Sequence, residues 1–576
     1  METKTIIYQI FTRLFGNSNN NCIPNGSKEQ NGCGLFNDIT TKALSEIKKL
    51  GATHVWFTGI IAHATQTNYT HYGLPTDHPA VVKGKAGSPY AIKDYYDVDP
   101  DLASNPEQRM NEFQQLLLRT HNAGLKAIID FVPNHVARQY KSTRKPQETK
   151  DLGEDDDKSK AFDPQNNFYY LPHQQFNPAF DLKASAATSY TEYPAKATGN
   201  DCFSPRPGKN DWYETIKLNY GIDYCAGHTR HFTPTPSTWI KMRDILLFWA
   251  EKGIDGFRCD MAEMVPVEFW SWVIPQIKQH HPDLIFIAEV YNPNEYRNYI
   301  RNGHFDYLYD KVGLYDTLRN VVCGYTPAHN ITHCWQSTDD IKTHMLNFLE
   351  NHDEQRIASQ YFAGNAAKAR SALIVSTCMG NNPFMIYFGQ ELGERGMDEE
   401  GYSGRDGRTT IFDYWSVNTI RRWNNNGHFD QTLLTPDEQA LRTFYSTILN
   451  LCHTEDALYN GEFYDLTYAN LNSPTFNSDR CFAFVRRKAA NLILILTNFS
   501  EQNMRAGVQI PQHLFEFMQI QEINTIEATN LIDNAKETIT FNTHNKTTTT
   551  IPAFSGKLLK INVRPSQNPN TQAINN

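Results

Sequence analysis

The sequence contains no hydrophobic run that could cross a bilayer. The longest runs, such as NLILILTNF at 491–499, are less than half of the roughly 20 residues that a membrane-spanning helix needs. A secretory signal is also missing, because the stretch KTIIYQIFTRLFG at 4–16 alternates like a strand and has no cleavage-site pattern. We therefore expect a cytoplasmic protein that does not associate with membranes.

An excess of positive charge is absent too. The chain has 54 lysines and arginines against 63 aspartates and glutamates, which gives a net charge of -9. This balance argues against nucleic acid as a partner. The ten cysteines form no CxxC pair, so we expect most of them to be small core residues. Loop disulfides Cys22/Cys33 and Cys202/Cys225 remain the alternative for an exported protein.

Hydrophobic residues make up 40% of the 576 residues and charged residues 20%, which is enough for a sizeable core. Up to about Trp423, apolar strand-like runs alternate with amphipathic helical runs, which predicts a (β/α)8 barrel with helices outside a parallel sheet. The expected strands are 5–11, 53–59, 126–132, 253–260, 284–290, 305–310, 345–351 and 384–390. The clearest expected helices are 41–50, 106–124, 238–253 and 267–281.

Two regions do not fit the barrel repeat. About a hundred residues rich in Pro, Asn and Tyr follow the third strand, and a structureless loop of that length is improbable. Short strands separated by turns follow Leu451. We therefore predict these domains: a catalytic barrel at 1–135 and 238–450, an inserted domain at 136–237, a C-terminal antiparallel β-sandwich at 451–563 and a disordered tail at 564–576.

Polar residues stand at the ends of four expected strands, where a parallel barrel carries its active site. Side chains alternate along a strand, so Arg258 and Asp260 share one face while Cys259 points to the other. The four groups of strand-end residues are Asp130 with Asn134 and His135, Arg258 with Asp260, Glu289, and His352 with Asp353.

Three carboxylates, those of Asp260, Glu289 and Asp353, therefore converge in the predicted barrel. Two carboxylates at a sugar ring are enough to hydrolyse a glycosidic bond, one as nucleophile and one as acid and base. Arg258 would keep Asp260 ionised, and the apolar strand around Glu289 suits an acid catalyst. A single Arg–Asp pair is usually only a structural ion pair, so the argument depends on all four strand ends together.

The segments DFVPNH (130–135), GFRCD (256–260), AEV (288–290) and NHD (351–353), in this order, resemble the alpha-amylase superfamily, glycoside hydrolase family 13. The resemblance implies that Asp260 is the nucleophile, that Glu289 is the acid and base, and that Asp353 is a third carboxylate that holds and distorts the sugar.

The resemblance also implies that Arg258, His135 and His352 line the subsite where the bond breaks. The stretch GSPYAIKDYYDVDP (87–100) is similar to the family segment after strand two, and there Tyr90 would be the aromatic platform under the reacting ring. KLNYG (217–221) occupies the place of the motif in the family's inserted domain.

The chain departs from the pattern just after the nucleophile. Many calcium-dependent members have Lys-His where this chain has Glu263 and Met264. In the family the Lys binds the sugar on the leaving-group side, which Glu263 cannot copy, and the His offers a backbone oxygen to calcium. The resemblance implies no cofactor for the chemistry and leaves a structural Ca2+ open, with Asn134 as a weak candidate ligand.

These features predict a retaining glycoside hydrolase that cleaves α-glucosidic bonds, chiefly α-1,4, in maltooligosaccharides or starch-derived dextrins. A retaining mechanism requires the carboxyl groups of Asp260 and Glu289 to lie about 5–5.5 Å apart. Two alternatives remain: a transglycosylase of the same superfamily, and a catalytically inactive carbohydrate-binding protein.

Overall fold

The computed structural model describes residues 3–182 and 188–566. Eight parallel strands form a closed barrel in the order β1-β16-β15-β14-β13-β12-β5-β2, so all eight predicted strands are confirmed. Their bounds are β1 Ile6–Phe11, β2 His54–Thr58, β5 Lys126–Phe131, β12 Gly256–Cys259, β13 Ile285–Ala288, β14 Tyr307–Tyr309, β15 Met345–Phe348 and β16 Phe384–Tyr387.

The barrel closes through its first strand. β1 pairs with β2 from Ile7 opposite His54, and with β16 from Ile6 opposite Phe384. Side chains alternate between the two sides of the wall, as period two requires. One apolar cluster, with Ile7 and Ile128 among its members, is separate from the larger cluster that includes Ile6 and Ile129 and the surrounding helices. The strands are therefore buried on both faces, as in other parallel sheets.

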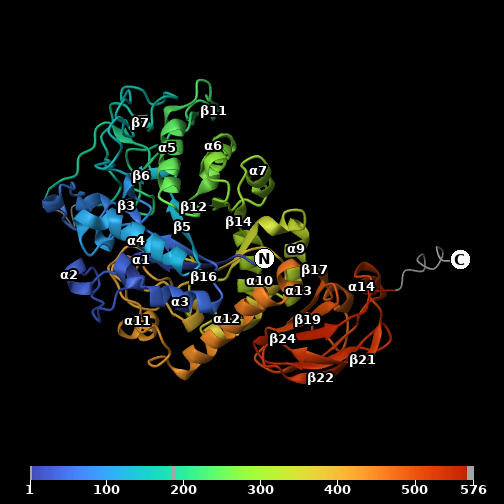
Figure 1. The fold of residues 1–576 in the computed structure, drawn as a ribbon. Helices are drawn as coiled ribbons and strands as arrows, with labels where there is room; N and C mark the ends of the chain where they lie inside the picture. The colour runs from blue at the N-terminus through green and yellow to red at the C-terminus, as the bar shows by residue number, and fades with distance from the viewer. Residues whose placement is uncertain (1–2, 183–187, 567–576) are drawn as a thin grey trace.

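Helices surround the barrel (Figure 1). The four predicted ones are confirmed within a few residues: α3 Thr41–Leu50, α4 Arg109–Asn122, α5 Ser237–Glu251 and α6 Val267–His280. Later helices that the sequence did not delimit include α7 Tyr296–Arg301, α8 Asp316–Val322, α9 Ile331–Thr338, α10 Arg370–Cys378, α11 Asn418–Asn424 and α12 Pro436–Thr454. α3 ends at Gly51 in a left-handed conformation, where a Cβ atom would lie 2.8 Å from Leu449 of α12.

Residues 136–237 contain short antiparallel ladders beside long loops. β6 (His135–Ala137) pairs with β9 (Thr215–Lys217), and this register places Lys217 opposite His135. The other ladders are β7 (Tyr170–Leu171) with β8 (Ala195–Lys196), and β10 (Ile222–Asp223) with β11 (Thr229–Arg230). In Figure 1 this segment lies beyond one end of the barrel, close to α5. It therefore covers the barrel end to which β5 and β12 deliver their polar residues.

The C-terminal part is antiparallel and has its own apolar core, as predicted. One sheet has the order β17-β18-β19-β24-β21-β22, and β20 pairs with β23. The predicted strand segment 547–563 is two strands on different sheets, separated at Pro552, because proline cannot donate to a ladder. The strands are β17 Glu462–Asp465, β18 Cys481–Lys488, β19 Asn491–Asn498, β20 Met504–Val508, β21 Ile523–Asn530, β22 Lys536–Phe541, β23 Thr547–Ile551 and β24 Ser555–Asn562.

The predicted tail begins at residue 564, and its residues 567–576 lie outside the described part of the chain. Within the described part, no helix is both long enough and apolar enough to cross a membrane. All ten cysteines lie in the described part and are free thiols, including the two pairs considered for loop disulfides.

Candidate active site

Arg258 stands at the centre of a cluster of charged side chains at the carboxyl ends of the barrel strands. Cys259 packs in the helix-facing core, so Arg258 points into the barrel, as the alternation of side chains predicts. The Nη1 atom of Arg258 lies 2.6 Å from Asp260 Oδ1 and 3.4 Å from Asp130 Oδ1. The Nη2 atom lies 2.8 Å from Glu289 Oε2. One guanidinium therefore joins three carboxyl groups that come from three neighbouring strands.

The carboxyl groups outnumber the one cation. Burial lowers the pKa of Arg258, but Glu289, Tyr309, Tyr90 and Asp260 together raise it well above its ordinary value. Burial raises the pKa of Asp260, and the adjacent Arg258 opposes that rise without cancelling it. Burial, with Glu289 nearby, raises the pKa of Asp353 to about 7. Arg258 therefore favours the ionised form of Asp260, as expected, while burial and the neighbouring carboxyl groups of Glu289 and Asp353 oppose it.

Each carboxylate oxygen of Glu289 has its own partners. Oε2 accepts the backbone N–H of Met261 at 2.8 Å in addition to contacting Arg258. Oε1 accepts the hydroxyl of Tyr291 at 2.5 Å. Met261 adopts a left-handed backbone with φ 43°, which costs a non-glycine residue roughly 1 kcal/mol or more, and this turn aims its N–H at Glu289.

A second group of polar residues holds Asp353. His352 Nε2 lies 3.1 Å from Asp353 Oδ2 and 2.5 Å from the Tyr90 hydroxyl. The Gln9 amide approaches Nδ1 at 2.9 Å as a donor, which assigns the ring proton to Nε2. Burial and Arg258 lower the pKa of His352 well below its ordinary value, so the ring is neutral. The Tyr90 ring stacks on His352 with the centroids 5.2 Å apart.

These groups surround a cavity of about 340 Å³. Asp260, Glu289, Asp353, Tyr90 and His135 all line it, as expected for site residues. Arg258 and His352 are not among its lining residues and contact the lining carboxylates instead. Further lining residues come from outside the four motifs: Lys83, Ser88, Trp212, Glu214, Thr215, Met261, Tyr291, Ile411 and Phe412.

Sequence reasoning missed several residues in and around the site. Gln9 and Trp56 are inward-facing residues of β1 and β2, and the Trp56 indole donates to Asp130 at 3.0 Å. Tyr291 lies two positions after Glu289, so the alternation along that segment was a usable signal for it. Trp212 belongs to the inserted segment and packs 5.2 Å from the His135 ring, a contact with no local sequence signal.

The residues around Asn134 do not fit a calcium ion. The Asn134 Oδ1 atom accepts the Lys217 ammonium at 2.6 Å, and the same ammonium lies 2.6 Å from Asp201 Oδ1. The Asn134 amide nitrogen is bonded to the Gly199 carbonyl at 2.8 Å. A divalent cation needs such oxygens for itself, and here a nearly buried lysine already holds them. Across the described residues, no three His, Cys, Asp or Glu side chains gather as metal ligands do.

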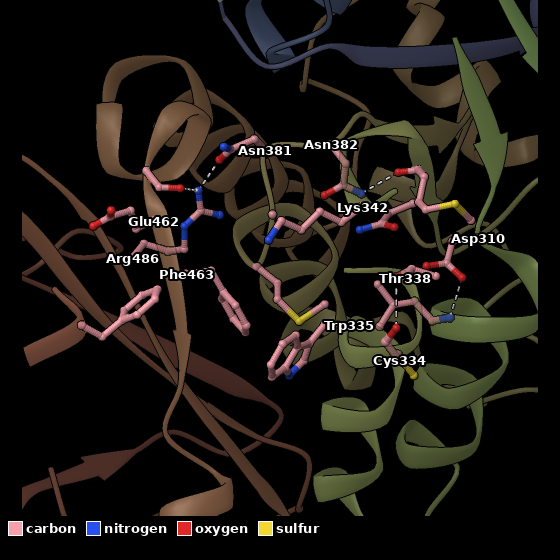
Figure 2. A pocket seen from close by; sticks show the side chains of 17 residues that line it. Asp310, Cys334, Trp335, Thr338, Lys342, Asn381, Asn382, Glu462, Phe463 and Arg486 are labelled. Atoms are coloured by element: carbon pink, nitrogen blue, oxygen red, sulfur yellow. Dashed lines mark hydrogen bonds between the residues drawn. The ribbon is translucent and has the colours of Figure 1, made fainter. Parts of the chain in front are cut away.

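A second cavity, of about 200 Å³, lies between the barrel and the C-terminal domain (Figure 2). Asp310 after β14 and Arg486 of β18 border it from opposite sides, with Trp335 and Phe463 between them. Arg486 donates to the carbonyl oxygens of Cys378 and Gly461, each at 2.9 Å. None of the predicted site residues lines this cavity.

Known proteins share the fold and the family of this chain. Residues 9–422 match the family model described as alpha amylase, catalytic domain. Alpha-amylase 3 of Dictyoglomus thermophilum is 22% identical over 477 residues, covering 79% of this chain and 78% of that protein. Neopullulanase 2 of Thermoactinomyces vulgaris is 21% identical over 531 residues, covering 88% of this chain and 72% of that protein.

A solved structure has the same fold over nearly the whole length of this chain. Alpha-amylase GTA of Geobacillus thermoleovorans, in complex with acarbose, superposes with a TM-score of 0.62 at 18% identity. The match covers 98% of this chain and 99% of that chain. An identity this low shows the common fold, whereas the family model spans well over half of the sequence. The chain belongs to the alpha-amylase family and is a glycoside hydrolase.

Proposed function

We propose that the protein is a retaining glycosidase that hydrolyses α-glucosidic bonds, chiefly α-1,4, in maltooligosaccharides and starch-derived dextrins. The observation that carries the proposal is the bridge made by Arg258, with Nη1 on Asp260 and Nη2 on Glu289. Two carboxyls on one guanidinium are close neighbours, and close carboxyls favour a retaining mechanism over an inverting one.

The proposed reaction has two displacements. Asp260 attacks the anomeric carbon, the bond to the leaving oxygen breaks, and Glu289 gives that oxygen a proton. Glu289 then takes a proton from water, the water oxygen bonds to the anomeric carbon, and the bond to Asp260 breaks. Asp353 lines the cavity and is placed to bind sugar hydroxyls beside the nucleophile, while the neutral His352, 3.1 Å away, holds Asp353 in position.

The proposal includes no cofactor and no calcium requirement. Its support is Lys217, whose ammonium neutralises Asp201 and binds Asn134 without a metal ion. Burial lowers the pKa of Lys217 and Asp201 opposes this. The charge that a bound cation would bring to these loops is therefore supplied by the chain itself.

Relatives named alpha-amylase and neopullulanase support a substrate from the starch and pullulan group. The ten free thiols suit a reducing compartment, which supports a cytoplasmic place of work.

Product analysis tests this proposal. The protein is incubated with maltooligosaccharides, pullulan, trehalose and sucrose, and products are separated while NMR records the anomer released first. We expect shorter maltooligosaccharides in the α-configuration. Longer oligomers early in the reaction would instead identify a transglycosylase, and binding of maltoheptaose with no turnover would identify an inactive binding protein. A β-anomer released first would contradict the double displacement.

A further inference from the structure

Glu263, where the chain departs from the family pattern, binds backbone rather than facing the cavity. It lies in the short 3-10 helix Ala262–Met264 that follows β12. Its Oε2 atom accepts the N–H of Tyr291 at 3.1 Å and the N–H of Asn292 at 3.0 Å. The hydroxyl of Tyr299 in α7 holds the backbone carbonyl of Glu263 at 3.1 Å. Glu263 therefore ties the segment after β13 to the segment after β12.

The segment that Glu263 holds includes Tyr291, whose hydroxyl donates a hydrogen bond to Glu289. Oε2 of Glu289 is taken by Met261 N–H and by Arg258, each at 2.8 Å. Oε1 remains as the oxygen that can exchange a proton with a substrate, and the Tyr291 hydroxyl lies 2.5 Å from it. Tyr291 also lines the cavity that Asp260 and Asp353 line. Because the acid protonates the leaving oxygen, Tyr291 borders the leaving-group side.

We propose that Glu263 and Tyr291 are positioning residues for the acid catalyst: Glu263 fixes the backbone of Tyr291, and the Tyr291 hydroxyl orients Oε1 of Glu289 toward the leaving oxygen. The inference rests on the proposed function and names the part of the site that deals with the leaving sugar. In this chain Glu263 clamps the backbone of Tyr291 and Asn292.

The proton that reaches the leaving group comes from Glu289 and not from Tyr291. Burial, followed by the charge of Glu289, holds the pKa of Tyr291 well above its ordinary value, so the phenol keeps its proton. In the first displacement the bond to the leaving oxygen breaks as the Glu289 proton transfers to it. A glycosyl fluoride breaks its C–F bond without a proton, so correct placement of Oε1 matters for sugars and little for fluoride.

The test compares kcat/KM for maltotriose and for α-maltosyl fluoride in matched variants. Tyr291→Phe keeps the ring and removes the hydroxyl, so we expect about a 10-fold loss on maltotriose and a change of about 2-fold or less on the fluoride. Glu263→Leu should show the same split. Glu263→Gln, whose amide oxygen still accepts both N–H groups, should recover most of that loss. The double variant Y291F/E263L should fall little below Y291F, since both changes act through one contact.

Glu268→Gln is the matched control, because Glu268 is a nearby carboxylate that pairs with the exposed Arg230. Glu268→Gln should leave the ratio of kcat/KM for maltotriose to kcat/KM for α-maltosyl fluoride unchanged. Equal losses on both substrates in Y291F would overturn the inference, as would damage in E263Q that equals the damage in E263L. Wild-type protein that turns over neither substrate would overturn the proposed function itself, whereas an unchanged ratio in active variants overturns only this inference.

Discussion

Arg258 and Arg486 are both fully buried, and their surroundings are opposite. Arg258, inside the barrel, contacts the carboxyl groups of Asp130, Asp260 and Glu289. Arg486, where the C-terminal domain meets the barrel, donates to two backbone carbonyls and to the Asn381 side chain. The second region also buries Lys4, which donates to the carbonyls of Thr377 and Gly380.

The pKa values of the two regions move in opposite directions. In the barrel, anions hold the pKa of Arg258 well above its usual value. At the junction, burial lowers the pKa of Arg486 to about 10 and that of Lys4 to about 8. In the barrel, carboxyl groups outnumber cations, so some of them can take up and release protons, as the proposed reaction requires. Cations held by carbonyl dipoles fix two surfaces together, at a cost in desolvation.

The largest expected effect comes from removing a carboxylate from the cluster around Arg258. Asp260→Asn should lower turnover by at least about 10⁴-fold, because the proposed nucleophile is lost. Folding should be retained, since Arg258 keeps Glu289 and Asp130 as partners. Initial rates on maltotriose and thermal melting together check this, and turnover near that of the wild type would remove Asp260 from the mechanism.

A substitution at the junction between the barrel and the C-terminal domain should change the stability of the protein and not its activity. Arg486→Met leaves the carbonyls of Cys378 and Gly461 buried without their donor, and we expect a loss of about 2–4 kcal/mol in the free energy of unfolding. The rate per folded molecule should not change. Urea unfolding measures the loss, with Arg487→Met as the control, because Arg487 pairs with the exposed Glu462.

Another buried cation sharpens the comparison, since Lys217 pairs with one carboxylate and one amide oxygen. Lys217→Met should cost about 1–3 kcal/mol of stability, because Asp201 and Asn134 lose their shared partner. The exposed Lys209, in the same inserted segment, serves as the control. The melting temperature of the wild type should not change when a chelator or calcium is added. A marked fall of the melting temperature in the presence of chelator would contradict the assignment of Lys217 as the cation of this site.

Within a single pH unit, the smallest effect is the pH dependence that Lys4 contributes. Its pKa is about 8 in the fold against an ordinary 10.5, so the unfolded chain binds more protons between these values. The cost of burying the charge is therefore fully present below pH 8 and is relieved as the pH rises toward 10.5. Relative to Lys4→Met, the wild type should gain up to about 1.4 kcal/mol per pH unit in that window.

Urea midpoints measured at several pH values check this, with the exposed Lys42→Met as the control. If the wild type and Lys4→Met have parallel pH profiles across this window, Lys4 is not the group that titrates there.

The sequence was enough to predict the barrel and the polar residues at the ends of its strands, because apolar runs and period-two alternation are local signals. GFRCD already placed Arg258 beside Asp260, and the structure confirms the pair at 2.6 Å. The roles of Arg486 and Lys217 could not be predicted, since their partners Cys378 and Asn134 are 108 and 83 residues away in the chain. Tyr291 falls between these cases. Its spacing from Glu289 is a local signal in the sequence, but its proposed role depends on the contact with Glu263, which only the structure shows.

The closing strand has a consequence for synthesis. β1 needs β16 as a neighbour, and Phe384 of β16 is translated long after its register partner Ile6. At about 5–20 residues per second, the nascent chain exposes one unpaired edge of β1 for roughly 20–75 seconds. An open strand edge invites pairing with other chains. Ribosome-bound chains that stop short of β16 should therefore be the ones that recruit chaperones, and release from the chaperone should coincide with translation of Phe384–Tyr387.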